Sequence, residues 1–321
     1  MNKTKIWLIV AVSLILIGSL IFAGVMSMLE WDFTKLTTEK YETNEHTVSG
    51  EYRNIIVKTK TANVDFIPSA NGGTSVVCYE AKKQQHTVSL DGDTLVVEIN
   101  DERKWYDHIG IGFISPKVTV YIPQGEYNSL SVKTSTGDVD IPRELVFDSI
   151  DIAGSTGDIT CRASVMGLIK IKNSTGDICL ENVSAGRLDL KLTTGKITLT
   201  DINCEGDLTT DVSTGKTDIS NVTCESLTSD GSTGSILLEN VVASGKFFIE
   251  RDTGNVRLDG CDAAEIYIET DTGNVSGSLL TSKVFITDTD TGNVDVPKSV
   301  GCGICEINTD TGDIEIEIDI K

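Results

Sequence analysis

Apolar and polar residues alternate along the second half of the chain, and the alternation returns with a nearly constant period. A Thr-Gly dipeptide marks the same point of each repeat ten times, and successive glycines are 19 or 20 residues apart. The ten glycines are Gly137, Gly157, Gly176, Gly195, Gly215, Gly234, Gly254, Gly273, Gly292 and Gly312. Such a period is typical of one structural unit stacked on copies of itself.

Within each repeat, apolar residues favour positions seven and five before the glycine and positions two and four after it. The residues seven before it are Leu130, Ile150, Ile169, Leu188, Leu208, Leu227, Phe247, Ile266, Phe285 and Cys305. A spacing of two is the side-chain period of a strand. Glycine suits a corner between two strands because it tolerates positive φ. Each repeat is therefore predicted to be a strand, a Thr-Gly corner, a second strand and a variable return.

One such repeat is too small to fold alone, because ordering each residue costs about 1–2 kcal/mol of backbone entropy. Stacked coils pair their strands and share one core. We therefore predict an all-β fold, a parallel β-solenoid of about ten coils of 19–20 residues over residues 127–321. Its last strand, from Ile314 onward, carries alternating acidic residues that we expect to protect the free edge.

The N-terminal region divides into three predicted parts. Residues 6–29 form an apolar stretch longer than the about 20 residues needed to cross a bilayer. Residues 1–30 are thus predicted to be a cytoplasmic stub and a transmembrane anchor, with lysines before it and acids after it placing the C-terminal rod outside the cytoplasm. A cleaved signal peptide is the alternative, although no convincing cleavage site follows.

Residues 31–50 are predicted to be a juxtamembrane spacer, and residues 51–126 an irregular β-rich cap over the first coil. Within this cap, Asp91-Gly92-Asp93 predicts a hairpin. The segment Thr61–Val64 resembles a degenerate first copy of the corner.

The net charge of −21 and the pI near 4.4 argue against nucleic acid as a partner. Solubility alone could explain this charge, but its distribution is uneven. Early repeats carry lysine four residues before the glycine, whereas later repeats carry acids there. These later acids are candidate partner-binding residues: Asp211, Asp230, Glu250, Glu269 and Asp288.

A second acidic row lies two residues before the glycine, where serine and threonine give way to aspartate. Its members are Asp252, Asp271, Asp290 and Asp310. Stacked carboxylates repel, so side-chain bonds to the backbone, the neighbouring ladder of Asn255, Asn274 and Asn293, or bound cations are needed to offset the repulsion. These four aspartates are weak metal candidates, for which Ca²⁺ would suit the oxygen ligands.

Three bulky apolar residues stand six before successive glycines, beside the acids. Phe248, Tyr267 and Ile286 are predicted to face outward as an apolar stripe unless the return segment covers them. An apolar stripe flanked by charge is typical of a protein-interaction site.

The eight cysteines favour no metal or redox site. Cys204 and Cys224 share a phase of the repeat and are expected to stack, as free thiols or as a disulfide. The lone Cys302–Cys305 CxxC pair is too weak to indicate zinc.

Catalytic classes find little support, and we expect no catalytic residue and no organic cofactor. Asp-Thr-Gly at 252–254 is the local signature of aspartic proteases, but here it is a late copy of the repeated corner. Glycosidases and lyases on β-helices use long loops for which this chain has no room. Acyltransferases on similar coils need a catalytic histidine, and His46, His86 and His108 all precede the repeats. Paired threonines such as Thr270 and Thr272 resemble ice-binding arrays, but the pairs are interrupted.

The anchor at 6–29, the β-rich entry and the Ser-Thr-Gly-Asp copies at Ser155–Asp158 and Ser174–Asp177 together resemble the bacterial putative-adhesin family. This resemblance covers most of the chain and implies a membrane-anchored protein with β-strand repeats, of a kind linked to envelope-stress operons in Gram-positive bacteria. The family offers no catalytic residues.

We therefore expect a membrane-anchored, extracytoplasmic β-solenoid that acts as a non-catalytic, adhesin-like binding or scaffolding protein. Its partner would be a protein or glycan of the cell envelope. A cation-binding or envelope-stress sensing module is the main alternative, and a carbohydrate-active β-helix enzyme is the third.

Overall fold

The computed structural model describes residues 3–32, 40–102, 115–298, 300–301 and 303–319. One helix, α1 (Lys3–Met28), precedes a series of strands that belong to a single sheet coiled on itself. His108 and Cys302 lie outside the described residues, as do residues 33–39 of the predicted spacer. The spacer was predicted to be polar and without regular structure, but its second half forms the strand β1 (Tyr41–Val48).

The strands β1 to β13 build the N-terminal part and the first repeats. They are β1 (Tyr41–Val48), β2 (Asn54–Lys58), β3 (Asn63–Pro68), β4 (Thr74–Ala81), β5 (Gln84–Asp91), β6 (Thr94–Asp101), β7 (Lys117–Ile122), β8 (Glu126–Lys133), β9 (Val139–Ile141), β10 (Val146–Ala153), β11 (Ile159–Cys161), β12 (Ser164–Thr175) and β13 (Ile178–Thr194). The later repeats hold β14 (Ile197–Cys204), β15 (Leu208–Thr214), β16 (Thr217–Cys224), β17 (Leu227–Thr233), β18 (Ile236–Ala243), β19 (Lys246–Thr253), β20 (Val256–Cys261), β21 (Glu265–Thr272), β22 (Val275–Leu279), β23 (Val284–Thr291), β24 (Val294–Asp295), β25 (Ile304–Thr311) and β26 (Ile314–Ile318).

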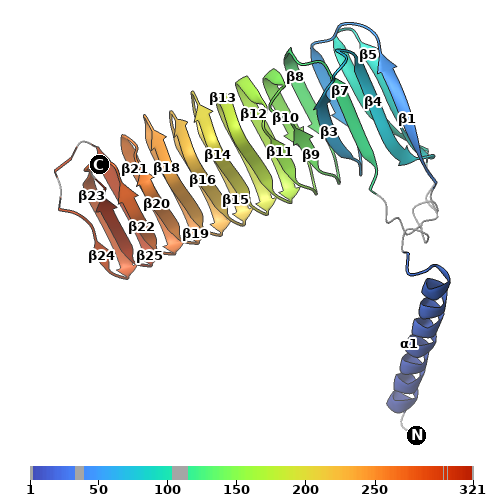
Figure 1. Cartoon of the computed structure of the whole chain (residues 1–321). Coiled ribbons are helices and arrows are strands. Elements are labelled where there is room, and N and C mark those ends of the chain that lie inside the picture. Colours follow the sequence, from blue (N-terminus) through green and yellow to red (C-terminus); the bar gives the residue numbers. More distant parts are fainter. Residues whose placement is uncertain (1–2, 33–39, 103–114, 299, 302, 320–321) are drawn as a thin grey trace.

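The repeats form the predicted parallel β-solenoid, with about nine turns (Figure 1). Equivalent residues of neighbouring coils pair directly, as Leu188, Leu208, Leu227 and Phe247 do in β13, β15, β17 and β19. Parallel pairing in register places like residues above like, so each repeat position becomes a ladder along the rod.

One apolar cluster runs the length of the rod, from Ile55 to Ile316. The predicted inward positions line it except in the end coil, where Val294 is exposed. Thr210 and Ser229 are buried in it as a hydrogen-bonded pair at 2.7 Å. The return segment also contributes inward side chains, such as Val222 and Cys224, which the sequence pattern did not reveal. Position three before the glycine is inward as well, because Thr270 and Thr309 are buried and donate hydrogen bonds to corner carbonyls.

At the Thr-Gly corners, the glycine of one coil lies too close to the backbone of the next for any side chain to fit at that position. A Cβ added to any of the ten glycines would lie between 1.7 and 2.4 Å from a carbonyl oxygen of the neighbouring coil. A second corner stands six residues later, where Asn182, Asp201, Asn221 and Asn240 have φ between 52° and 56°. Asparagine and aspartate tolerate this left-handed conformation better than other residues with a side chain.

The N-terminal cap is continuous with the solenoid. The coil β2–β3 pairs in parallel with β8–β9 on one side and with β6–β7 on the other. The degenerate corner predicted at Thr61–Val64 is confirmed, since Ala62 and Asn63 contact Gly137 and Asp138 as the later corners do. The predicted hairpin is also confirmed, with β5 antiparallel to β6. The apolar core crosses residue 126 without a break, and the division into domains stays a prediction.

Chain order and spatial order differ at the far end of the rod. Strand β25 lies between β21 and β23, and β26 lies between β22 and β24. The expectation that the last strand protects the free edge is therefore wrong, because β26 is inside the stack. Repeats with the same cross-section can exchange places in a stack, so the periodicity alone does not fix their order.

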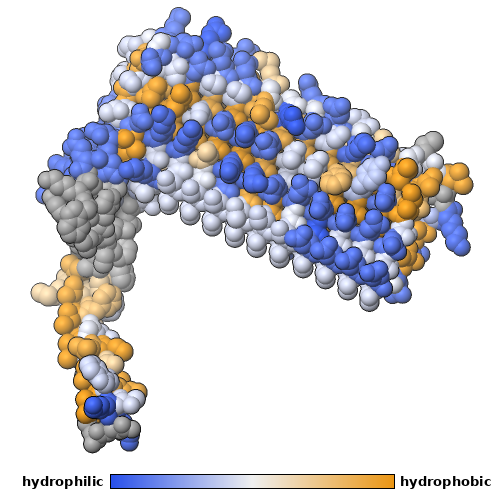
Figure 2. Space-filling model, turned by 180° about the vertical axis from the view of Figure 1, so that it is seen from behind, coloured by the Kyte–Doolittle hydropathy of each residue, from blue (hydrophilic) through white to orange (hydrophobic). Residues whose placement is uncertain are grey.

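The coil β23–β24 forms the free end instead. Among the described strands, β23 pairs only with β25 and β24 only with β26. Val284, Ile286 and Val294 are between 43% and 50% exposed there, and Figure 2 shows apolar side chains gathered at this end. Figure 2 also shows a regular row of residues of intermediate hydropathy along one edge of the rod, as a stack of equivalent small residues produces.

The helix α1 matches the predicted anchor in place and composition. It has 26 residues, a mean hydropathy of 2.8 over its most apolar window, and no buried surface there. Its length and composition suit a membrane span, and a signal sequence has the same properties.

We predict that Gly215→Ala destabilises the solenoid by about 3 kcal/mol or more. Gly215 has φ of 145°, and a Cβ would lie 1.7 Å from the Gly195 carbonyl oxygen. Gly125→Ala is the matched control, because its Cβ would meet nothing within 4 Å. Chemical denaturation of the two variants checks the prediction, and equal stabilities would contradict the close-stacking account.

Candidate binding surface

Phe248 and Tyr267 lie side by side on the outer face of the solenoid. They are direct partners in the pairing of β19 with β21. Phe248 is 43% exposed and Tyr267 is partly exposed, so the return segment does not cover them. Together with Glu269 and Glu306 they line a shallow depression on this face. The two aromatic rings thus form an exposed apolar patch with carboxylates beside it.

A small polar cluster positions the Tyr267 ring. Lys246 Nζ lies 3.0 Å from Glu265 Oε2 and 5.7 Å from the centre of the ring, and the Tyr267 hydroxyl donates to Glu265 at 3.2 Å. The hydrogen bond to Glu265 raises the pKa of Lys246, and the same bond lowers the pKa of Glu265. A cation beside an aromatic face stabilises that ring orientation modestly at an exposed site.

The predicted third member of the stripe does not adjoin the other two. Glu306 pairs with Tyr267 on one side and with Ile286 on the other, because β25 lies between β21 and β23. Ile286 is 50% exposed, but it belongs to the free end of the rod. The continuous stripe of Phe248, Tyr267 and Ile286 is therefore wrong, since it assumed that coils stack in chain order.

The acids four before the glycines form a ladder over four coils. Asp211, Asp230, Glu250 and Glu269 are successive partners across β15, β17, β19 and β21. Asn308 then separates Glu269 from Asp288, because β25 lies between β21 and β23. Lys191 forms an ion pair with Asp211 at the near end of this ladder, and their hydrogen bond raises the pKa of Lys191. The ladder flanks the Phe248–Tyr267 patch.

The four metal candidates are exposed at the corner. Their coils stack in the order of Asp252, Asp271, Asp310 and Asp290, as the pairing of the adjacent threonines shows. Among the described residues, none of these four carboxylates has a hydrogen-bond partner, and no three of them bring ligand atoms within 4.8 Å of one another. Calcium at this ladder stays a prediction.

The neighbouring position one after the glycine caps the corner amides. Asn255 Oδ1 accepts from the Asn274 amide at 2.9 Å, and Asn274 Oδ1 accepts from the Asp313 amide at 2.9 Å. Asp313 Oδ1 accepts in turn from the Asn293 amide at 2.8 Å. The predicted ladder of Asn255, Asn274 and Asn293 is therefore interrupted, because Asp313 lies between Asn274 and Asn293. The side chains of Asn255, Asn274 and Asp313 still accept hydrogen bonds from backbone amides at the corner.

A buried arginine lies behind the acidic ladder. Arg251 is 3% exposed, and its guanidinium donates to the Ser229 carbonyl at 2.9 Å and the Ser229 hydroxyl at 2.7 Å. Burial lowers its pKa to about 10, against the opposing effect of Asp230 and Asp211. Sequence reasoning missed it, although an arginine three before the glycine, where Leu192 and Val212 stand in earlier coils, was a visible signal.

A second acidic region was also missed. An open depression of about 480 Å³ has Ser276, Gly277 and Ser278 as its floor, with Arg257 and Asp259 on one side and Glu315 and Glu317 on the other. The depression exists because the small residues of β22 lie between two strands with longer side chains. The altered coil order brings these acids together, so the linear sequence did not indicate them.

The cysteines behave as small core residues. Cys78, Cys161, Cys204, Cys224, Cys261 and Cys305 are buried free thiols in the described part of the chain. Cys204 and Cys224 lie in neighbouring coils, as the pairing of β14 with β16 requires. Burial raises the pKa of Cys224 to about 12, which leaves it as an unreactive thiol.

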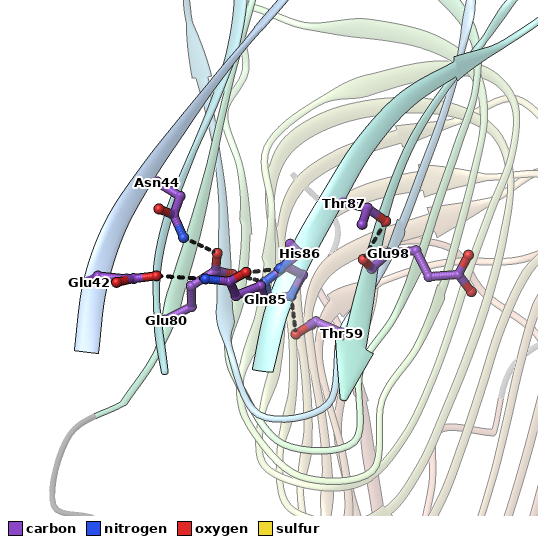
Figure 3. A network of polar contacts seen from close by, with 8 residues as sticks. All are labelled: Glu42, Asn44, Thr59, Glu80, Gln85, His86, Thr87 and Glu98. Atoms are coloured by element: carbon purple, nitrogen blue, oxygen red, sulfur yellow. Dashed lines mark hydrogen bonds and ion pairs between the residues drawn. The ribbon is translucent and has the colours of Figure 1, made fainter. Parts of the chain in front are cut away.

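The cap contains a buried polar network around Glu80 and His86 (Figure 3). Glu80 Oε2 lies 2.6 Å from His86 Nδ1 and accepts from the His86 amide at 2.7 Å, while Oε1 accepts from Asn44 at 2.8 Å. His86 Nε2 lies 3.1 Å from the Thr59 hydroxyl. Burial raises the pKa of Glu80, but the bonds from His86 and Asn44 lower it by more, so the net shift is downward.

The fold and these surfaces define an all-β solenoid with an N-terminal apolar helix and an exposed acidic and aromatic face. The chain belongs to the Toastrack DUF4097 family, whose profile matches residues 52–212, half of its length. A comparison with curated proteins gave no match.

Several solved structures are similar to this chain. A putative adhesin from Parabacteroides distasonis is 12% identical, with a TM-score of 0.47 over 87% of this chain and 98% of its own. A putative lipid binding protein from the same species is 14% identical, with a TM-score of 0.45 over 85% and 98%. A putative adhesin from Bacteroides fragilis is 16% identical, with a TM-score of 0.38 over 88% and 99%.

We predict that Asp230→Asn stabilises the chain more at neutral pH than in acid. Burial, followed by the neighbouring Asp211, raises the pKa of Asp230 above its ordinary value of 3.8, and its buried Oδ1 has no hydrogen-bond partner among the described residues. An acid with a raised pKa in the folded state loses stability as pH rises through that pKa, and regains it below the unfolded value.

The melting temperatures of wild type and Asp230→Asn, measured between pH 7 and pH values below 3.8, check this sign. The advantage of the asparagine variant should shrink on acidification through the window just above 3.8. An advantage that grows on acidification would contradict the assignment.

Proposed function

We propose that this chain is a non-catalytic scaffold of the bacterial cell envelope, anchored by α1, with its solenoid outside the cytoplasm. Membership of the Toastrack DUF4097 family and the long apolar helix support this assignment. The lysines before the helix and the acids after it favour the extracytoplasmic orientation.

The solenoid would bind a protein partner through the outer face of β17, β19 and β21. The observation that carries this proposal is the exposed pair Phe248 and Tyr267 beside the unbroken ladder Asp230, Glu250 and Glu269. Aromatic residues are enriched at protein interfaces, and a complementary partner would bring basic residues to the ladder. Strand pairing on both sides makes this face rigid, which lowers the entropic cost of binding.

A cation-binding role is the second candidate. The exposed aspartates at the corner and the acidic depression beside β22 favour it, since carboxylate oxygens are the ligands of hard cations. A rise of the melting temperature with calcium that is lost with a chelator would support this role and not the first.

We predict that α1 stays on the mature protein. Intact-mass measurement of the chain from its native membrane should give the full 34.6 kDa, less the mass of any removed initiator methionine. The protein should also remain with the membrane after washes with salt or alkali, because a predominantly apolar helix of 26 residues inserts stably. A shorter mass ending after the helix would show a cleaved signal sequence.

We predict that the double variant Phe248→Ser/Tyr267→Ser loses its protein partner. Cross-linking in the cell envelope, followed by capture of the full chain, would compare it with wild type and with Met166→Ser. Met166 is 66% exposed and lies on β12, away from the patch, so it is the matched control.

Loss of two central aromatic residues should weaken a partner by about tenfold or more, because each removes about 1 kcal/mol or more from an interface. Ile286→Ser should leave capture unchanged, since Glu306 separates Ile286 from Tyr267. Equal capture by wild type and the double variant would remove this face as the binding site.

A further inference from the structure

The cap contains a cluster of metal-ligating side chains that the solenoid does not require. His46 is on β1, and Cys78 and Glu80 are on β4, which pairs antiparallel with β1. One ligand atom from each of the three residues lies within 4.8 Å of the other two, and no other group of three such residues occurs in the described part of the chain.

The alternation of strands explains why these residues face one another. Asn44 lies opposite Cys78 and His46 opposite Val76, so His46, Cys78 and Glu80 all project from the same side of the β1–β4 pair. Val76 and Cys78 are fully buried on that side, and Glu80 is 1% exposed. Cys78, Glu80 and the Nε2 atom of His46 are therefore shielded from solvent, although His46 as a whole is partly exposed.

Two atoms of the cluster lack partners. His46 Nε2 is buried and has no hydrogen-bond partner among the described residues. The Cys78 sulfur is likewise buried without a hydrogen bond in the described part of the chain. A buried polar atom without a partner costs about 1–3 kcal/mol, so the arrangement of His46 needs an explanation.

We propose that His46 Nε2, Cys78 Sγ and a Glu80 carboxylate oxygen bind a thiophilic divalent cation, of which Zn²⁺ is the model ion. A thiolate and a carboxylate would together balance the two positive charges, so the occupied site is neutral and suited to burial. On binding, the Cys78 thiol releases its proton to solvent and its sulfur bonds to the metal. The nitrogen, sulfur and oxygen donors match the ligands of zinc and not those of calcium.

The surrounding residues support this assignment. His86 and Asn44 hold the Glu80 carboxylate with hydrogen bonds of 2.6 and 2.8 Å, as outer residues commonly orient a ligating group (Figure 3). Ligand atoms on one tetrahedral zinc lie about 3.3–3.5 Å apart, so the cluster would contract by about 1 Å or slightly more on binding. A fourth position remains for a water molecule.

The location of the cluster gives the ion a structural consequence. Among the described strands, β1 pairs only with β4, and β1 is the first strand after α1. A metal bridging β1 to β4 would fasten the segment that connects the helix to the cap. Metal loading would thereby set how firmly β1 stays attached to the solenoid, independently of any partner on the outer face.

The test uses the untagged full chain in detergent, freed of metal and kept reduced, and titrated first with Co²⁺ and then with Zn²⁺. Wild type should show a thiolate-to-cobalt charge-transfer band that saturates at one equivalent and disappears when Zn²⁺ is added. Zn²⁺ should also raise the melting temperature, because it binds the folded state.

Cys78→Ala should abolish the band and weaken Zn²⁺ binding by about 100-fold or more. Cys161→Ala is the matched control, since Cys161 is an equally buried thiol in the solenoid and should leave both signals unchanged. Should Cys78→Ala fail to fold, His46→Ala on the partly exposed edge strand must give the same loss. A folded wild type without the band, or a band retained in Cys78→Ala, overturns the proposal and assigns a water molecule to His46.

Discussion

The close approach of one corner glycine to the next is the constraint on which this structure depends. Each Thr-Gly corner is stacked so that the carbonyl of one coil occupies the space where a side chain of the next would begin. This contact sets the spacing of the coils and keeps neighbouring strands in register. Because the register is fixed, every other repeat position becomes a straight ladder, whether apolar, hydroxyl, amide or acidic. The faces of the rod follow from the corner.

The ladders also explain how a repetitive fold carries a local surface. A substitution in one repeat changes one residue of a ladder, and the paired strands of the two neighbouring coils keep its backbone in place. Phe248 and Tyr267 are two such residues, and they lie beside acids that also occur in successive coils. Arg251 is another residue that only one repeat carries, and its buried side chain points inward behind the acids of the outer face. Individual coils thus differ in their side chains while the backbone of the repeats stays the same.

The sequence predicted the period, the corner and the core positions of the two strands that flank the corner, because each depends only on residues within one repeat. It did not reveal the core positions of the return segment, such as Val222. It failed where one repeat had to be placed against another. Ile286 was assigned to a stripe with Tyr267, yet Glu306 lies between them, since identical cross-sections give no sign of stacking order. The cluster of His46, Cys78 and Glu80 was missed for a related reason. Its members belong to irregular antiparallel strands, where no period relates one residue to another.

The inserted position of the last coil has a consequence for biosynthesis. Residues 304–318 leave the ribosome after residues 284–295, yet they occupy the inner place in the stack. The rod therefore cannot be completed by adding coils one by one in the order of translation. The coil β23–β24 must therefore stay unpaired with β21–β22, or be displaced from them, until β25 and β26 enter the stack. Completion of this end of the solenoid is thus delayed until residues 304–318 have been synthesised and can enter the stack.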